Sequence, residues 1–573
     1  MWRTQWNVQK PNKVLRQRTP LCFGEAVYHL VIACCLSVSL TGRPNILLIV
    51  SDDLRPAMGS YGFSGVMTPN LDQLASESVV FRNAFAQQAV CAPSRTSFLT
   101  SRRPDATRLY DFNSYWRVHA GNYTTLPQYF KEQGYHTMSV GKVFHPGIAS
   151  NHSDDFPYSW SVPPYHPASL AYEKRKVCRG KDGKLHANLL CAVNVSEMPL
   201  KTLPDMESTA EAIRLLQSMR EAQEPFFLAV GYHKPHIPFR IPQEFLKLYP
   251  LENMTLAPDP EVPKGLPPVA YNPWTDIRKR EDVQALNVSF PYGPIPPDFQ
   301  LRIRQHYFAA VSYVDSLVGM LLSTLDDLGL ARNTVVLFTS DHGWSLGEHG
   351  EWAKYSNFDV ATRVPLLIHV PWVMSRAGRT VGRSFPFWDV FHLPLFPSGW
   401  AVRSVVELVD LFPTLAELAG LKVPPPCPHA SFAVQLCTEG SSLVPSLRAP
   451  EHRIDTEAIA YSQYPRPSDE PRDDSDLPSL PDIRIMGYSV RSWDYRYTLW
   501  VTFDPTHFQA NLSDIHAGEL YLLWEDPGQD HNVYDSSEHS VPYRKLSSVL
   551  PWRDVLKQYL LCFRKGLKPE GML

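Results

Sequence analysis

The sequence predicts an α/β protein with a large mixed, mostly parallel sheet flanked by helices, and a smaller C-terminal domain built on an antiparallel sheet. Three observations support this prediction. Unbroken apolar runs alternate with amphipathic segments, each apolar run is followed at once by polar or ionisable residues, and short alternating runs follow a polar, Pro-rich stretch. Continuous apolar runs are typical of strands buried on both faces, and strand–helix alternation favours a doubly wound sheet.

Four apolar runs are the predicted strands of the large sheet, at residues 45–50, 137–140, 226–231 and 334–339. The residues that follow them include Asp52, Lys142, His236 and Asp341. In open α/β sheets, ligands bind beyond the carboxyl ends of the strands. We therefore expect the functional site where these four runs end.

The remaining elements follow from local patterns. Residues 208–220 are a predicted helix that begins with a Ser208/Glu211 capping box, and residues 302–328 are a long amphipathic helix. Residues 448–481 are rich in Pro, Asp, Ser and Glu, which predicts an exposed connection. Partly alternating runs predict the small antiparallel sheet, at residues 483–491, 495–503 and 519–524, before an amphipathic helix at 552–565.

The length of 573 residues favours two domains, which we place at 43–447 and 482–573. Hydrophobic residues make up 44% and charged residues 20%, as in soluble globular proteins. The net charge of −3 gives no reason to expect a nucleic-acid partner. Proline accounts for 52 residues, about 9% against a usual 5%, which predicts long irregular loops.

Residues 1–42 have the composition of a secretory signal peptide. Five basic residues precede an apolar run at 26–40 that ends in small residues. The run of about 15 residues is shorter than the ~20 that a membrane span needs, although an uncleaved anchor is the alternative. No other segment is predicted to cross a bilayer, so we expect no membrane association after cleavage.

Glycosylation and cysteine patterns also favour secretion. Six Asn-x-Ser/Thr sequons are predicted acceptor sites on surface loops, at Asn122, Asn151, Asn194, Asn253, Asn287 and Asn511. Cys178 with Cys191 and Cys427 with Cys437 are closely spaced pairs in polar loops, which suits local disulfides in an oxidising compartment. Cys91 has no obvious partner.

The segment Cys91-Ala-Pro-Ser-Arg95 is the most specific motif. Pro93 and Ser94 favour a first helical turn, which would place Cys91 just before a helix N-terminus, a position that attracts anions. This motif resembles the sulfatase family, in which Cys-x-Pro-Ser-Arg directs oxidation of the cysteine to formylglycine. The resemblance implies the alkaline-phosphatase-like sulfatase fold, with 43–447 as the catalytic domain. Ser101 departs from the glycine that usually ends the family signature, and we expect slower or less complete conversion at worst.

A divalent metal site is predicted at two strand ends. Adjacent carboxylates repel each other, and a cation relieves that repulsion. Asp52, Asp53, Asp341 and His342 are the predicted ligands, with Cys91 completing the set, although an Asp-Asp pair is more often a solvated turn. Three carboxylates favour one calcium ion per chain over zinc, while His342 is unusual because many relatives carry Asn there.

The family resemblance also implies catalytic roles. Arg95 would hold the formylglycine hydroxyl, and Lys142 and Lys354 would bind the sulfate oxygens. His145 would take a proton from the second hydroxyl, and His236, with a share from Lys354, would protonate the leaving alcohol. A lone histidine is more often structural, but these two follow predicted strands. His233 and Lys234 are candidates for supporting positions only.

Four further segments resemble one lysosomal group within the family, at residues 84–95, 109–119, 341–359 and 461–468. This closer resemblance implies an exo-sulfatase that removes the 2-O-sulfate of terminal L-iduronate in heparan sulfate and dermatan sulfate. It further implies maturation by the formylglycine-generating enzyme, sorting by the mannose-6-phosphate receptor, and cleavage near 448–475. We expect a monomer. Arg491 is a candidate for the uronate carboxylate, with a plain surface arginine as the equal alternative.

Three rival functions remain open at this point. The first is a sulfatase of another sulfated glycan. The second is a phosphatase or phosphodiesterase of the same fold, which typically uses Ser or Thr with two metals. The third is a secreted glycan-binding pseudoenzyme, against which the intact set of Cys91, Arg95, Lys142, His145, His236 and Lys354 argues. The histidines also predict an acidic optimum.

Overall fold

The computed structural model describes residues 42–180, 182–374, 400–428, 431–448 and 455–535, and Pro44–Leu573 form one compact unit. Its large sheet has seven described strands in the order β13-β2-β12-β9-β1-β7-β3. In that order the strands span Trp400–Glu407, Val79–Phe85, Arg363–His369, Thr334–Ser340, Asn45–Asp52, Phe226–Pro235 and His136–Gly141. β12 pairs antiparallel with both neighbours, and the other pairings are parallel. The expected mixed, mostly parallel sheet is confirmed, and all four predicted strands lie side by side in it.

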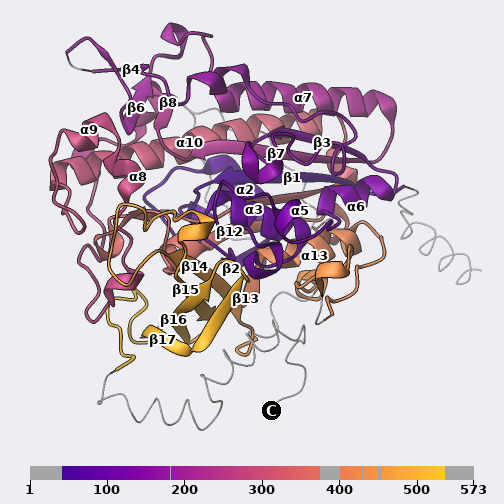
Figure 1. The fold of residues 1–573 in the computed structure, drawn as a ribbon. Helices are drawn as coiled ribbons and strands as arrows, with labels where there is room; N and C mark the ends of the chain where they lie inside the picture. The colour runs from indigo at the N-terminus through magenta and orange to yellow at the C-terminus, as the bar shows by residue number, and fades with distance from the viewer. Residues whose placement is uncertain (1–41, 181, 375–399, 429–430, 449–454, 536–573) are drawn as a thin grey trace, which may run out of the picture. The chain divides into compact units, whose positions relative to one another are not determined.

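Helices cover both faces of this sheet (Figure 1). The helices α2 (Pro69–Ser76), α7 (Pro204–Ala222) and α10 (Pro297–Asp327) pack on one face, and α3 (Cys91–Thr100), α6 (Leu126–Glu132) and α13 (Leu411–Leu418) on the other. β1 shows why its sequence is continuously apolar. Leu47 and Ile49 belong to the core on the α10 side, whereas Ile46, Leu48 and Val50 belong to the core on the α13 side. Burial on both faces explains why the run from Ile46 to Val50 contains no polar residue.

The two predicted helices are present, but each begins a few residues earlier than expected. α7 starts at Pro204, and Ser208 lies inside it, so the predicted capping box is wrong. Proline at the first helical position is preorganised for a helix start, and Glu211 instead pairs with Arg214. α10 is long and apolar enough by composition to span a membrane, which we did not expect, yet 78% of its apolar window is buried inside the unit.

Shorter helices and two-stranded pairs connect these elements. The described short α-helices are α4 (Pro104–Thr107), α5 (Trp116–His119), α8 (Thr275–Arg278), α9 (Glu281–Gln284), α11 (Asp359–Thr362), α12 (Pro371–Met374) and α14 (Val444–Arg448). Three two-stranded pairs accompany them: β4 (Cys178–Arg179) with β5 (Leu185–His186), β6 (Leu190–Val193) with β8 (Phe239–Pro242), and β10 (Ser345–Leu346) with β11 (Trp352–Ala353).

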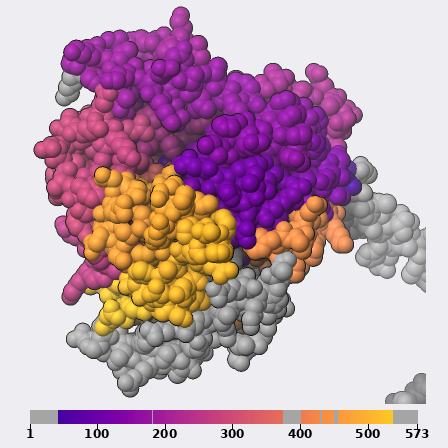
Figure 2. All heavy atoms as spheres, in the orientation of Figure 1, coloured from indigo at the N-terminus to yellow at the C-terminus, as the bar shows by residue number. Residues whose placement is uncertain are grey.

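The predicted antiparallel sheet is present with an additional strand. β14 (Ala460–Arg466), β15 (Ile485–Arg491), β16 (Tyr495–Asp504) and β17 (Gln509–Leu522) form it in that order. β14 is buried along its whole length, although we expected it within an exposed connection. The reason is that it pairs with β15 and also meets the large sheet, where Gln463 N donates to Gln87 O (2.9 Å). Figure 2 shows this orange and yellow part of the chain against the indigo N-terminal part.

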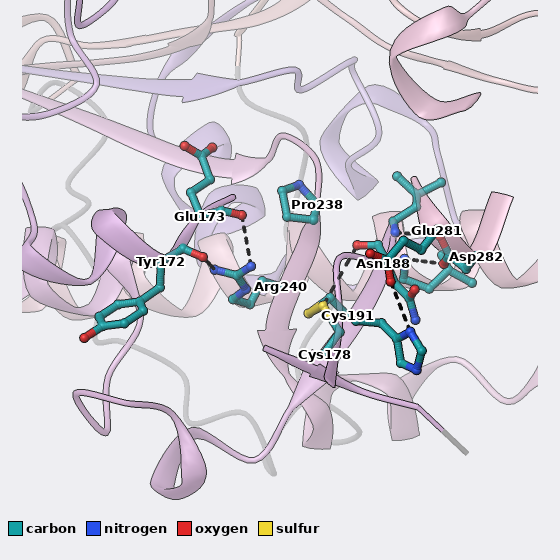
Figure 3. The surroundings of a disulfide bond; sticks show 12 residues. Tyr172, Glu173, Cys178, Asn188, Cys191, Pro238, Arg240, Glu281 and Asp282 are labelled. Carbon is teal, nitrogen blue, oxygen red and sulfur yellow. Dashed lines mark hydrogen bonds and ion pairs between the residues drawn. A yellow bond between two sulfur atoms is a disulfide. The ribbon is translucent and has the colours of Figure 1, made fainter. Parts of the chain in front are cut away.

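Both predicted disulfides are present, Cys178–Cys191 and Cys427–Cys437. Beside the first, Arg240 donates to the carbonyls of Tyr172 (2.7 Å) and Glu173 (3.0 Å), as Figure 3 shows. This links the segment before the disulfide to β8. The asparagines of all six sequons are exposed, as acceptor sites must be. Residues 1–41, the 552–565 helix and residues 449–454 of the expected connection lie outside the described residues.

Candidate active site

The carboxyl ends of β9, β1, β7 and β3 meet at one edge of the sheet and carry the predicted residues. Asp52 ends β1, while Asp341 directly follows β9 and Lys142 directly follows β3. Gly141 allows β3 to approach β7 closely, because a Cβ at this position, where φ is +72°, would lie 2.2 Å from Gly231 O. The expectation of a site at this edge agrees with the observed placement.

Cys91 is the first residue of α3, one position further into the helix than expected, and it is fully buried. Its Sγ lies 3.0 Å from Lys354 Nζ, whose ammonium also binds Asp53 Oδ1 at 2.7 Å. Burial raises the pKa of the Cys91 thiol, and the nearby carboxylate of Asp52 raises it further. A neutral buried thiol is a poor nucleophile. The unmodified side chain is therefore unsuited to the chemistry, although its position at a helix N-terminus suits an anion.

Three buried carboxylates and one histidine surround Cys91. The ligand atoms of Asp52, Cys91, Asp341 and His342 all lie within 4.8 Å of one another. Asp53 is adjacent, with Oδ1 3.4 Å from His342 Nδ1. His342 Nδ1 donates to Gly343 O at 3.0 Å, which leaves the lone pair of Nε2 free to bind a cation. The predicted ligands are thus gathered in one buried cluster.

The backbone at Asp53 shapes this cluster. Asp53 has a φ of 66°, which is unusual for a residue other than glycine. Its N–H donates to Asp341 Oδ1 (3.1 Å), and its carbonyl accepts from the Tyr307 hydroxyl (2.8 Å). These two bonds fix the turn that brings consecutive carboxylates to the same point. Strained backbone of this kind collects at functional sites.

Three cations neutralise the three carboxylates. Lys142 Nζ contacts Asp52 Oδ2 at 2.5 Å, and Lys354 contacts Asp53. Arg95 Nε binds Asp341 Oδ2 at 2.9 Å, and its Nη2 lies 3.4 Å from Asp52 Oδ1. Arg95 therefore braces two predicted metal ligands, a contact that the sequence did not predict. Three positive and three negative side chains sum to zero, so an added divalent cation would make the site attractive to an anionic sulfate.

The pKa values of the carboxyl groups diverge. Burial raises the pKa of Asp53 to about 6 and that of Asp341 to about 7, with repulsion from Asp52 adding to both. Burial also disfavours the charged form of Asp52, but Lys142, His236 and Arg95 outweigh it and hold the pKa of Asp52 well below its usual value. Buried carboxylates that repel one another in this way are stabilised in their charged form when a cation binds between them.

Both predicted catalytic histidines are half-buried beside this cluster. Ligand atoms of His236, Asp53 and Cys91 lie within 4.8 Å of one another, and His236 Nδ1 contacts Ile237 O at 2.6 Å. The ring of His145 stacks face to face on Phe112, with ring centroids 4.3 Å apart. Burial and the positive charges of Lys142 and Lys354 hold the pKa values of both histidines well below the usual value.

Asp205 is a supporting residue that the sequence analysis missed. This buried carboxylate, in the first turn of α7, accepts from the backbone N–H of His233 (2.7 Å) and of Lys234 (2.9 Å). Lys234 in turn donates to His236 O and to Pro238 O, so these residues shape the loop that carries His236. An acidic residue in a first helical turn is too common for its sequence to signal this contact.

Arg491 does not present a free guanidinium. Its Nε lies 3.0 Å from Asp359 Oδ2, and its Nη1 donates to Ser492 O. The ion pair engages it within the fold, which favours the structural alternative over binding of a substrate carboxylate.

The fold and the site together define a sulfatase. A family model described as Sulfatase matches residues 44–421, and the chain belongs to the sulfatase family and is a sulfuric ester hydrolase. Among curated relatives, the iduronate 2-sulfatases of Mus musculus and Homo sapiens are each 66% identical to this chain, over 512 and 509 residues. Each alignment covers 87% of this chain and 92% of the relative.

A solved structure supports the fold at greater distance. The phosphonate monoester hydrolase of Agrobacterium radiobacter superposes with a TM-score of 0.61 at 21% identity, covering 90% of this chain and 96% of that one. Similarity at this level shows a shared fold and not a shared substrate. The alkaline-phosphatase-like fold predicted from the sequence is confirmed.

Members of the sulfatase family use a formylglycine and a metal ion, and the residues present here fit both. Asp52 Oδ1, Asp53 Oδ2 and His342 Nε2 are buried and make no hydrogen bond within the described residues. Buried polar atoms without a partner are costly unless a ligand satisfies them. Cys91 is also the one free cysteine of the described residues, as the formylglycine position requires.

Proposed function

We propose that this chain is a lysosomal exo-sulfatase that hydrolyses the 2-O-sulfate of terminal L-iduronate in heparan sulfate and dermatan sulfate. The observation that carries the proposal is the 66% identity to two iduronate 2-sulfatases over 87% of the chain. The geometry of the site supports it, because the six predicted catalytic side chains come from α3 and from the segments that follow β3, β7 and β11, which meet at one sheet edge. The same proposal includes four further points: delivery to the lysosome, maturation by the formylglycine-generating enzyme, sorting by the mannose-6-phosphate receptor and a monomeric state.

In the proposed mechanism, formylglycine at position 91 supplies, as its hydrate, one hydroxyl that attacks sulfur and a second whose deprotonation expels sulfate. One calcium ion held by Asp52, Asp53, Asp341, His342 and residue 91 would neutralise charge on the sulfate oxygens. Lys354 lies within hydrogen-bond distance of residue 91, so it can bind the sulfate and stabilise the leaving oxygen. Lys142, which directly follows β3, holds a second sulfate oxygen.

Three proton transfers are needed. We assign the proton of the attacking hydroxyl to the carboxylate of Asp341, which lies beside residue 91, and the other two transfers to the two histidines. A ring nitrogen of His236 lies within 4.8 Å of residue 91 and of Asp53, and we assign it the proton given to the leaving iduronate oxygen, because an alkoxide of a sugar is a poor leaving group. We assign His145 the proton taken from the second hydroxyl. Its neutral form is favoured by burial and by Lys142, as a general base requires. Arg95 orients the hydroxyl of residue 91 while bracing Asp341 and Asp52.

The test is sulfate release from a disaccharide with a terminal iduronate 2-sulfate, compared with a glucosamine 6-sulfate disaccharide and with a phosphate ester. We expect turnover on the first substrate only, and loss of turnover in Cys91→Ala. Peptide mass spectrometry across residue 91 reports the conversion to formylglycine in the same preparation. Fully converted protein that cleaves another glycan sulfate faster, or the phosphate ester faster, would refute the proposed substrate.

A further inference from the structure

His145 lacks the hydrogen bond that usually orients a catalytic imidazole. Its Nδ1 is buried and has no hydrogen-bond partner among the described residues. Its carbonyl accepts from the Ser150 hydroxyl at 2.8 Å, which fixes the backbone but leaves the ring free to rotate. In most catalytic histidines, a carbonyl or carboxylate on the second ring nitrogen sets the ring orientation. Another contact must therefore do this here.

The face of Phe112 provides that contact. The two rings are stacked with centroids 4.3 Å apart and an interplanar angle of 8°. Phe112 also packs against the apolar cluster that contains Ala92 and Trp116, so its own position is set by the helix that begins at Cys91. A rigid ring on one face of the imidazole restricts its rotation without blocking either nitrogen. Such aromatic pairs contribute about 0.5–1.5 kcal/mol beyond their buried area.

Asp111 anchors the turn that presents Phe112. It is 1% exposed, and its Oδ1 accepts from the backbone N–H groups of Asn113 and Ser114, each at 3.0 Å. Its Oδ2 accepts from Leu480 N at 3.0 Å. Leu480 belongs to the segment just before β15, so this carboxylate ties the turn around Phe112 to the C-terminal sheet.

We propose that Phe112 is a positioning residue for His145, held in place by Asp111, and that it keeps the imidazole aimed at residue 91 during catalysis. The proposal rests on the proposed function for the role of His145, whereas the placement of the ring rests on geometry alone. The C-terminal sheet acts on catalysis through this chain of contacts, from Leu480 to Asp111, Phe112 and His145. This explains how a sheet remote in sequence contributes to the sulfatase site.

The test compares Phe112→Leu, which keeps apolar volume without a ring, with Phe112→Tyr, which keeps the ring face. We expect Phe112→Leu to lower kcat about tenfold with KM little changed, because a freely rotating base weakens proton transfer after substrate binds. Phe112→Tyr should restore kcat. Tyr115→Leu is the matched control, since Tyr115 lies in the same segment and packs edge-on against Trp116 instead.

A second readout reports the ring directly. Diethylpyrocarbonate acylates accessible neutral imidazoles, and peptide mass spectrometry gives the labelling of His145 relative to His507, whose side chain is 70% exposed. We expect a severalfold higher ratio in Phe112→Leu and a wild-type ratio in Phe112→Tyr and Tyr115→Leu. Wild-type kcat together with a wild-type labelling ratio in Phe112→Leu would overturn the proposal. If the parent enzyme were inactive on iduronate 2-sulfate, the proposed function would fail, while the labelling ratio would still decide the positioning.

Discussion

Lys354 Nζ lies 3.0 Å from Cys91 Sγ while it binds Asp53 Oδ1 at 2.7 Å, so one ammonium group joins the modified residue to the predicted metal site. Two non-glycine residues with positive φ, Ala353 (68°) and Tyr355 (76°), flank it. The Asn272 amide donates to the carbonyls of Lys354 (2.5 Å) and Trp352 (2.9 Å), which holds this strained segment in place. Strain at such a position is tolerated where the surrounding structure fixes it.

The first prediction concerns this ammonium group. We expect Lys354→Met to lower kcat/KM about 100- to 1,000-fold, as removal of a preorganised charge-stabilising donor does. Steady-state kinetics on the iduronate disaccharide measures the effect, and mass spectrometry verifies that residue 91 is converted. Lys176→Met is the matched control, because Lys176 pairs with Glu281 and its side chain is 65% exposed. A Lys354→Met enzyme with normal kinetics would exclude this role.

Calcium should stabilise the folded protein as well as support turnover. A cation that binds the folded site alone adds about 3–4 kcal/mol to the free energy of unfolding when its concentration exceeds Kd by 100- to 1,000-fold. We expect a chelator to lower the thermal unfolding temperature and added calcium to restore it. Asp341→Asn should lose this response, whereas Asp315→Asn, a buried acid bonded to Asn70 and Leu71, should keep it. An equal calcium response in both variants would place the ion elsewhere.

Part of this architecture could be predicted because local sequence determines it. The strands β1, β7 and β9 are buried on both faces, which gives each an unbroken apolar run, and the site residues could be predicted because they follow those runs. The edge strand β3 is also buried, but it includes Thr137 and Ser139. β12 escaped prediction because Pro365 interrupts it, and proline is expected only at sheet edges or bulges. In the structure, a register shift between Val364 and Leu366 accommodates Pro365 within the strand.

Other parts depend on contacts between distant segments. The stacking of Phe112 on His145 joins residues 33 apart in the chain, and nothing in either local sequence signals it. β14 was expected in an exposed connection because its neighbours are polar and rich in proline. Its burial follows from pairing with β15 and from the Gln463–Gln87 hydrogen bond, which only the folded chain brings together.

Stability should increase as the pH falls from about 8 to about 6.5. Burial raises the pKa of Glu351 to about 8, and the pKa values of Asp315, Asp410 and Asp476 to about 7. Unfolded carboxyl groups titrate near pH 4, so in this range these groups bind more protons in the folded state, and raising the pH costs stability, on the order of 1 kcal/mol per pH unit for each group whose folded pKa has not been passed. Below about pH 6.5 the buried histidines act in the opposite sense, because their lowered pKa values keep them neutral in the folded state.

Chemical unfolding at about pH 6.5 and about pH 8 measures this dependence. Glu351→Gln, which mimics the protonated form, should flatten it. Glu348 is the control acid, because Arg55 and Arg304 overcome its burial and lower its pKa to about 2, below the window. Greater stability at the higher pH would contradict the prediction.

The turnover rate should fall with rising pH, and this fall should lie in the acidic range. His236 must be protonated to protonate the leaving alcohol, and burial with the charges of Lys354 and Lys142 lowers its pKa. Activity should therefore fall as the pH rises toward about 6.5, the usual value for imidazole. The pH profile of kcat measures this limb, and His236→Gln should lower kcat and remove the limb. A profile that still rises beyond about pH 8 would exclude His236 as the acid.

Ser101 replaces the glycine of the family signature, and Ser101→Gly shows how this replacement affects stability. In the folded protein it takes the left-handed conformation at the end of α3, with φ 51°, where glycine is favoured. Its hydroxyl donates to Val409 O (2.5 Å) and accepts from Gly440 N (3.3 Å). Loss of these bonds offsets the relief of backbone strain, so we expect Ser101→Gly to change the free energy of unfolding by less than about 1 kcal/mol.

The effect of Ser101→Gly on maturation should be larger than its effect on stability. We expect conversion of Cys91 to precede folding, because the folded protein buries the thiol completely and closes it to another enzyme. The converting enzyme must then read the extended sequence around Cys91, where glycine completes the family signature. In cells with limiting converting enzyme, we expect a higher formylglycine fraction in Ser101→Gly than in the parent, measured by peptide mass spectrometry. Equal fractions would mean that position 101 is not read, and that Ser101 acts only through the folded contacts of α3.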